Sequence, residues 1–410
     1  MAAGTPLIWM KQATDCSGVC FACSMNSKGA PTLYHGERTD GTGSSLMSMM
    51  NTAAYAAKRG WNYGGIIRNS GARSSARELL GPALAGKQVA GGVRMTGHGQ
   101  AFDPVVEFFL GTRQLIHETI EAPKNRTLVI KLKRKYSPAH GGSAPLIEEM
   151  TTRLKDIKEP MQGISTIVVP GYFMDLKQFG TGDGRNGAYD DYYTAQFRSA
   201  LRASAACSLS KQQTWYFRAG QPWVAMHVRR GDVTSSRHPD RFTSDQYYYN
   251  VARVVRQHLP DADIHVFSST RDQFRRGEKN HTLENAVNRD VLHSARSFQG
   301  YRERNMTVHL DGDPLVASAH LMTAHVAVLA KSAFSWAPAA FNPHCIIYQD
   351  FSFHSLAHWS GANDRSGTNF SHALPDCLTA ARKVLSDGGH GAHPSWVFAR
   401  HVNELTRFFD

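Results

Sequence analysis

Short apolar strand segments alternate with helical segments along the second half of the chain. Five strand-like runs are rich in apolar and β-branched residues: residues 223–228, 264–267, 308–310, 326–330 and 345–348. Helical periodicity separates them, as in residues 244–258, where Ser244 is a start signal and Pro260 follows the end. This βαβα order predicts a parallel, doubly wound α/β sheet, with residues 345–348 as its last strand.

The first half of the chain has a similar but less regular pattern. Residues 32–36 and 61–67 are strand-like, and a helical pattern runs from Leu46 to Arg59 between them. A strand–helix–strand order requires a parallel crossover, so we expect a second α/β unit here. Further helices are expected at residues 103–119, 147–157 and 193–208, further strands at residues 127–131 and 165–170, and a long loop at residues 179–187.

The length of the chain, 410 residues, exceeds what one hydrophobic core usually supports. We therefore expect two domains, residues 1–211 and 212–410, with a last helix at about residues 395–409 that packs back on the first domain. Hydrophobic residues make up 41% of the chain, which suffices for globular folding.

A pair of arginines ends the strand-like run at residues 223–228, in the sequence Arg229-Arg230-Gly231-Asp232. Guanidinium groups at the end of a buried strand need an anionic partner, because desolvating an unpaired charge is costly. Ligands of open α/β sheets bind at the carboxyl ends of the strands, and the guanidinium fork matches phosphate oxygens. The pair therefore predicts a site for a nucleotide diphosphate. The alternative is a structural ion pair with Asp232 and Asp245.

Two segments of the chain resemble a known family. The sequence His227-Val-Arg229-Arg230-Gly-Asp232 resembles the H-x-R-R-x-D motif of the GDP-fucose-dependent fucosyltransferases, a superfamily with α1,2-, α1,6- and protein O-fucosyltransferases. The segment from Ala324 to Ser335 is similar to the family's apolar strand followed by S-x-F-S. The resemblance covers residues 222–351. It implies a GT-B-like fold, with two Rossmann-like doubly wound domains and the donor site in the C-terminal one.

The resemblance also implies an activity: inverting, metal-independent transfer of fucose from GDP-fucose to a glycan or protein hydroxyl. The expected catalytic residues are Arg229 at the β-phosphate, Arg230 as an assisting or internally paired cation, and Asp232 orienting an arginine or the loop. The full set of expected donor-binding residues is His227, Arg229, Arg230, Ser268, Ser332, Phe334, Ser335, Gly41 and Gly43. For His227 the alternative is a core histidine, and for Gly41 and Gly43 it is a turn before a helix.

No metal or cofactor is expected. The pair Asp311-Gly-Asp313 has the form of an Asp-x-Asp metal motif, but Pro314 after it is typical of a loop that starts a helix. A fixed cationic clamp can supply the same charge to the leaving diphosphate. The sequence does not identify a general base, and Asp240 and Asp245 are the carboxylates available near the motif.

The chain departs from the family pattern near the expected nucleoside. Ala324-His325 stands where Ala-Asp is common, and the small residues Ala317 and Ser318 stand where core-type α1,6 enzymes have an acidic residue. Another nucleotide sugar therefore remains an alternative donor. A catalytically silent glycan- or nucleotide-binding protein of the same fold is a further alternative.

The net charge, the cysteines and the targeting signals limit which partners, bonds and compartments the protein can have. The net charge of +12 suits an anionic partner, but no nucleic-acid motif is present. The family resemblance implies a nucleotide-sugar donor and a glycan or glycoprotein acceptor as partners. Of six cysteines, Cys16, Cys20 and Cys23 lack a second metal-binding half, which favours disulfides or buried thiols. No signal peptide or run of about eighteen apolar residues is visible. The family resemblance nevertheless implies the secretory pathway, Golgi or endoplasmic reticulum lumen, with membrane association only through an N-terminal anchor absent from this sequence.

Overall fold

The structure is a computed structural model, and part of the chain is described in it. The described residues are 27–36, 42–67, 102–112, 114–117, 120, 126–129, 164–169, 191–210, 212, 214–230, 233–235, 238–270, 295–349, 355–356, 358–362 and 373–384. Several predictions made above lie outside them: Gly41, Asp232, the cysteines 16, 20 and 23, the helices 147–157 and 395–409, and the loop 179–187. The described chain divides into two compact units between Ser204 and Ala205, and each is treated by itself.

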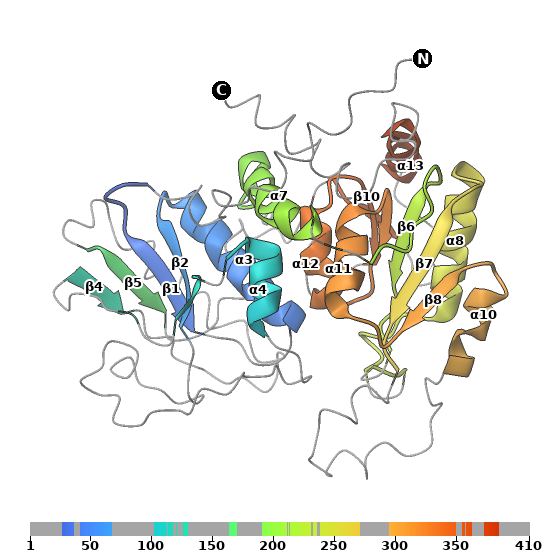
Figure 1. Cartoon of the computed structure of the whole chain (residues 1–410), viewed down its shortest axis with the longest axis horizontal. Coiled ribbons are helices and arrows are strands. Elements are labelled where there is room, and N and C mark those ends of the chain that lie inside the picture. Colours follow the sequence, from blue (N-terminus) through green and yellow to red (C-terminus); the bar gives the residue numbers. More distant parts are fainter. Residues whose placement is uncertain are drawn as a thin grey trace, which may run out of the picture. The chain divides into compact units, whose positions relative to one another are not determined.

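The C-terminal unit contains a six-stranded parallel sheet (Figure 1). Its strands are β6 (Trp223–His227), β7 (Asp263–Ser268), β8 (Thr307–Leu310), β9 (Val326–Val328), β10 (Cys345–Gln349) and β11 (Ser360–Ala362). They lie side by side in the order β11-β10-β9-β6-β7-β8, and every pair is parallel. Read from β8 and numbered within this unit, the order is 3-2-1-4-5-6, the strand order of the Rossmann fold.

Helices pack on both faces of this sheet. The helical elements of the unit are α8 (Asp245–His258), η6 (Ala295–Phe298), α10 (Gln299–Arg302), α11 (Pro314–Thr323), α12 (Ala333–Phe341) and α13 (Ala373–Val384). Apolar side chains of β6, β7 and β9 form one buried core with α8 and α13. The helices α11 and α12 lie on the other side of the sheet (Figure 1). The doubly wound arrangement predicted from the alternation is therefore confirmed.

Two details of this unit differ from the prediction. Strand β10 is not the last strand, because β11 (Ser360–Ala362) pairs with it in parallel. The sequence Ser-Gly-Ala has no apolar run, so its strand conformation depends on pairing rather than on local pattern. Helix α13 was not predicted either. A disulfide between Cys345 and Cys377 joins it to β10.

The N-terminal unit contains a five-stranded parallel sheet in the order β3-β2-β1-β5-β4. The strands are β1 (Thr32–Gly36), β2 (Asn62–Ile67), β3 (Ile116–His117), β4 (Thr127–Val129) and β5 (Thr166–Val169). Helix α3 (Thr42–Lys58) connects β1 to β2 as the expected parallel crossover, and it buries Leu46, Met47, Met49 and Met50. The other helices are α4 (Phe102–Leu110) and α7 (Ala195–Ser210), whose residues from Ala205 onward belong to the C-terminal unit.

The helix predicted at residues 103–119 is wrong over its second half. Helix α4 ends at Leu110, and the chain returns to the sheet as β3. Gly111 follows the helix with φ of 73°, in the left-handed region that glycine adopts at little cost. In the sequence, Leu115 and Ile116 continue the helical pattern. In the structure they follow the turn at Gly111, and Ile116 is the first residue of β3.

The predicted fold class, two α/β units with parallel sheets, is confirmed by these strand pairings. Within the described ranges, no helix combines the length and apolar character that crossing a bilayer requires.

Candidate functional site

The strand order of the C-terminal unit defines where a ligand can bind. From β6 the chain proceeds outward through β7 and β8, and it then returns to the other side of β6 as β9. The crevice of a Rossmann sheet lies outside the carboxyl ends of the two strands at this switch point. Here these strands are β6 and β9, so the crevice is bordered by residues 228–230 and 329–332.

The arginine after β6 is attached to the segment after β9. The Nη1 atom of Arg229 donates a hydrogen bond to the Lys331 carbonyl oxygen at 3.4 Å. The side chain of Arg229 is half-buried. Its guanidinium lies beside the segment that follows β9, and its contact with phosphate stays a prediction.

The neighbouring arginine has a different environment. Arg230 is 2% exposed, its Nη2 donates to the carboxylate of Asp245, and its Nη1 donates to the Arg229 carbonyl oxygen at 2.8 Å. Its guanidinium also lies over the ring of Phe242, 4.7 Å from the centroid. Tyr301 donates a second hydrogen bond to Asp245 at 2.7 Å. Arg230 was expected either to assist at the β-phosphate or to be paired internally, and these contacts fit the internal ion pair.

A second cation at the switch point was missed by sequence reasoning. Lys331 is 7% exposed, and its Nζ donates to the backbone carbonyl of Asp240 at 3.1 Å. The side chain therefore links the end of β9 to the loop that follows the arginine pair. Thr243 of the same loop donates to the Gln349 side chain at the end of β10, at 3.1 Å. In the sequence, Lys331 directly follows an apolar strand-like run. Only the tertiary structure shows that this strand lies beside β6.

The start of helix α12 faces the same strand ends. Ser332 caps the helix, since its Oγ accepts a hydrogen bond from the Phe334 backbone N–H at 3.2 Å. A helix N-terminus carries partial positive charge and suits an anionic ligand. Phe334 packs against the ring of His227, with centroids 5.1 Å apart. Ser335 is fully buried, and its hydroxyl donates to the carbonyls of Ala330 and Ser332 at 3.1 and 3.2 Å, so it stabilises the turn.

The remaining predicted residues are less central. The hydroxyl of Ser268, at the end of β7, donates to the Val228 carbonyl at 2.5 Å, which ties β7 to the end of β6. Gly43 lies in the first turn of α3, in the N-terminal unit, and is buried. Sequence reasoning also named Asp245 as an available carboxylate, but it is engaged by Arg230 and Tyr301. The Asp240 side chain is exposed beside the loop that Lys331 holds.

The aspartates of the Asp-x-Asp sequence have structural contacts. Asp311 accepts hydrogen bonds from the backbone N–H of Thr270, at 2.6 Å, and from the Thr270 hydroxyl. Asp313 caps α11 by accepting from the Leu315 N–H at 2.8 Å. Over the residues that the structure describes, no group of three or more His, Cys, Asp or Glu side chains is arranged to hold a metal ion.

Comparisons with known proteins give distant structural likenesses. No protein-family model matches the chain, and no curated protein sequence matches it. Among solved structures, Arabidopsis thaliana FUT1 in complex with GDP is 11% identical, with a TM-score of 0.36 over 82% of this chain and 74% of that chain. POFUT1 in complex with GDP is 11% identical, with a TM-score of 0.34 over 79% of this chain and 99% of that chain. The E. coli heptosyltransferase WaaC with an ADP-heptose analogue is 11% identical, with a TM-score of 0.31 over 87% and 99%.

Proposed function

We propose that the chain is a glycosyltransferase and that its C-terminal unit binds the diphosphate of a nucleotide sugar. The observation that carries this proposal is the convergence of Arg229, Lys331 and the start of α12 at the switch point of a Rossmann sheet. Each contributes positive charge at the place where such sheets bind their ligands. The Lys331 side chain and Arg229 are both held by backbone carbonyls, so the charges are positioned before a ligand arrives.

The chemistry of this site is the stabilisation of a leaving group. Transfer of a sugar breaks the bond between its anomeric carbon and the β-phosphate oxygen, and negative charge grows on the diphosphate. Fixed cations and helix dipoles aimed at that charge lower the barrier without the need for a metal ion. The exposed carboxylate of Asp240, beside the loop held by Lys331, is our candidate for the base that accepts the proton of the acceptor hydroxyl.

The donor that we propose is GDP-fucose, and the support is the H-x-R-R-x-D resemblance at His227–Asp232. The departure at His325 bears on this choice. Its ring accepts a hydrogen bond from the Trp223 N–H at 3.0 Å, so it serves the sheet at the amino end of β6 rather than a nucleoside. A donor with another base is therefore the second candidate. The acceptor that we propose is a glycan or glycoprotein hydroxyl.

The compartment that we propose is the lumen of the secretory pathway. The disulfide between Cys345 and Cys377 supports it, because such bonds persist in oxidising compartments.

The test is thermal stabilisation by nucleotides in the presence of EDTA. A ligand that binds the folded state raises the melting temperature by mass action. We expect GDP and GDP-fucose to stabilise the protein, guanosine to do so far less, and the GDP shift to disappear in Arg229→Ala. The matched control is Arg253→Ala, an exposed arginine on α8, which should keep the full shift.

The outcomes separate the candidates. Larger shifts with UDP or ADP would retain the phosphate site and replace the donor. Binding without turnover of GDP-fucose over an acceptor panel would favour a silent binding protein. An absence of any nucleotide shift would overturn the proposal.

A further inference from the structure

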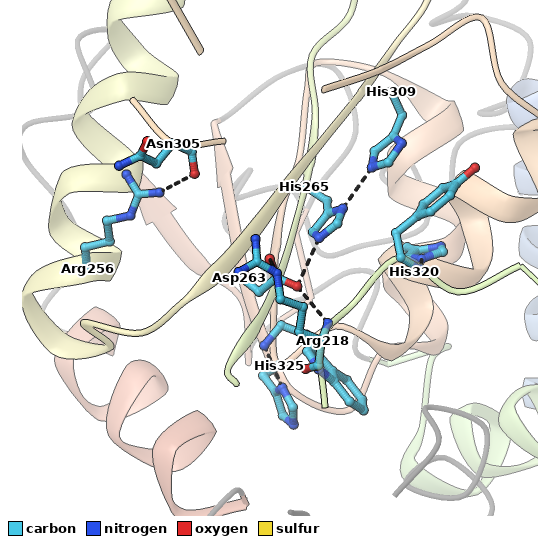
Figure 2. A network of polar contacts seen from close by, with 10 residues as sticks. Arg218, Arg256, Asp263, His265, Asn305, His309, His320 and His325 are labelled. Atoms are coloured by element: carbon cyan, nitrogen blue, oxygen red, sulfur yellow. Dashed lines mark hydrogen bonds and ion pairs between the residues drawn. The ribbon is translucent and has the colours of Figure 1, made fainter. Parts of the chain in front are cut away.

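The segment that precedes β6 in the C-terminal unit is held there by hydrogen bonds to three titratable side chains. This segment, residues 214–223, precedes β6 and includes the first residue of that strand. It lies across the face of the sheet that bears the side chains of Asp263, His265, Phe267 and His309 (Figure 2). We call residues 214–223 the strap.

Three backbone N–H groups of the strap donate to titratable side chains. The Tyr216 N–H donates to His320 Nε2 at 3.0 Å, on α11. The Arg218 N–H donates to Asp263 Oδ2 at 2.8 Å, at the start of β7. The Trp223 N–H donates to His325 Nδ1 at 3.0 Å, directly before β9. Figure 2 shows Arg218 beside Asp263, with His320 and His325 on other elements.

The protonation state of each acceptor follows from its partners. His320 Nδ1 lies 2.7 Å from the Val316 carbonyl oxygen, so Nδ1 carries the hydrogen and Nε2 offers a lone pair only if the ring is neutral. His325 can accept at Nδ1 only as the neutral ring with its hydrogen on Nε2. Asp263 accepts most strongly from the Arg218 N–H when it is ionised, and its Oδ2 also lies 3.1 Å from His265 Nε2.

Further histidine and tyrosine rings lie around the side chains that hold the strap. His265 continues this cluster, since its Nε2 lies 3.1 Å from Asp263 Oδ2 and its Nδ1 lies 2.8 Å from His309 Nε2. The ring of Tyr216 stacks on His309, with centroids 3.9 Å apart and planes inclined by 15°. The titratable groups that face His320 are thus His265 and His309 on the sheet and Tyr216 on the strap. His325 faces His344, and the Arg218 side chain, 69% exposed, faces Asp263.

We propose that the strap is a pH-sensitive element: neutral His320 and His325 and ionised Asp263 hold it on the sheet, and protonation of these side chains releases it. A protonated imidazole presents a second N–H in place of the lone pair. It then opposes the backbone N–H that it had accepted from, and it places a cation beside the neighbouring histidines. The inference does not depend on the identity of the donor or on the proposed activity.

The direction of the pKa shifts agrees with this arrangement. Burial lowers the pKa of His320 to about 3, against a small opposing effect of its bond to Val316, and burial lowers the pKa of His325 to about 4. Burial alone would raise the pKa of Asp263, but the hydrogen bonds from His265 and the Arg218 N–H bring it below its usual value. Released histidines return to an ordinary pKa near 6.5, so release takes up protons and is favoured as the pH falls below that value.

The experiment is hydrogen exchange of the strap amides at pH 7 and pH 5, corrected for the intrinsic pH dependence of exchange. We expect the amides of Tyr216 and Trp223 to lose protection about 20-fold per titrating histidine at pH 5, from proton linkage. Amides of residues 224–227, in the ladder between β6 and β7, report on global unfolding, which exposes the same histidines and more, so we expect them to lose at least as much protection but to stay better protected than the strap at both pH values. Strap amides that are as well protected as the ladder at both pH values, or strap protection that is unchanged at pH 5, would overturn the proposal.

Two substitutions keep the acceptor and remove the titration. In His320→Gln the side-chain oxygen can replace Nε2, and in His325→Asn it can replace Nδ1. We expect each variant to retain strap protection at pH 5 at the amide that it holds. The matched control is His35→Gln, a buried histidine of the N-terminal unit with a lowered pKa, which should leave the strap response unchanged. If one variant fails to fold, the other tests the proposal alone, and a wild-type response in both would contradict it.

Discussion

At the residue scale, two consecutive arginines have different environments. Arg229 is half-buried and held at the switch point by a backbone carbonyl, whereas Arg230 is buried against Asp245 and Phe242. The environment, and not the residue type, therefore separates Arg230, which serves the fold, from Arg229, which we propose for the ligand. Lys331 is also held by its environment, because its ammonium donates to the Asp240 carbonyl while its own backbone carbonyl accepts from Arg229.

Substitutions of the two arginines should separate stability from ligand binding. We expect Arg230→Ala to lower the free energy of unfolding by about 2 kcal/mol, because Asp245 loses its cation but is partly exposed to solvent. Arg229→Ala should change that free energy by less than about 1 kcal/mol while abolishing the GDP-induced shift. Urea unfolding followed by circular dichroism measures both variants. Equal destabilisation by the two would contradict the division of roles.

The Lys331 ammonium should contribute to diphosphate binding. We expect Lys331→Met to weaken GDP binding by about tenfold or more, from the loss of one charge-assisted contact, and to leave the weak binding of guanosine unchanged. Lys331→Arg should restore part of the affinity for GDP. Isothermal titration with both ligands distinguishes this result from general damage, which would weaken both alike.

At the element scale, the site is assembled by connections between strand ends. The loop after β6 is fixed to β9 through Lys331 and to β10 through Gln349, and β7 is tied to β6 through Ser268. These bonds hold the carboxyl edge of the sheet in one arrangement. On the face of the sheet opposite to α11 and α12, helix α13 packs on α8, and a disulfide joins α13 to β10.

The disulfide between β10 and α13 should contribute measurably to stability. It closes a loop with a sequence separation of 32 residues, for which the loss of unfolded-state entropy predicts about 4 kcal/mol. We expect the double variant Cys345→Ala/Cys377→Ala to have a lower urea midpoint by a corresponding amount. A reductant should lower the midpoint of the wild type and leave that of the variant unchanged. A wild type insensitive to reductant would contradict this contribution.

At the scale of the whole molecule, buried neutral histidines make the fold sensitive to acid. Burial is the first cause that lowers the pKa of His35 in one unit, and of His309, His320 and His325 in the other, to between about 3 and 4. Each ring is neutral in the folded chain and takes up a proton near pH 6.5 in the unfolded chain. The stability they provide is therefore complete above about pH 6.5 and is lost as the pH falls toward 4.

The urea midpoint measured as a function of pH tests whether stability falls as the pH falls. We expect a steady decrease from pH 7 to pH 4.5, and substitution of His35 or His320 by glutamine should make the decrease shallower. The net charge of +12 also disfavours the compact state in acid, but that repulsion is screened by salt. The profile should therefore persist at high ionic strength. A midpoint constant between pH 7 and pH 5 would contradict the neutral burial of these rings.

The sequence by itself determined the α/β class, the parallel crossovers, and the position of the arginine pair at a strand end. These features are local: β-branched runs, helical periodicity and the start signal at Ser244 act within about fifteen residues, and the structure retains them. Gly111 shows the limit of local pattern, since one residue in a left-handed conformation redirected an apolar run from helix to strand.

Only the tertiary structure decided which residues meet. The pairing of β6 with β9 brings Arg229 beside Lys331, although about a hundred residues separate them. The histidines that hold the strap come from α11 and the start of β9, and no spacing in the sequence marks them. Strand order follows from the burial of both faces of the sheet at once, a long-range balance that periodicity along the chain does not encode.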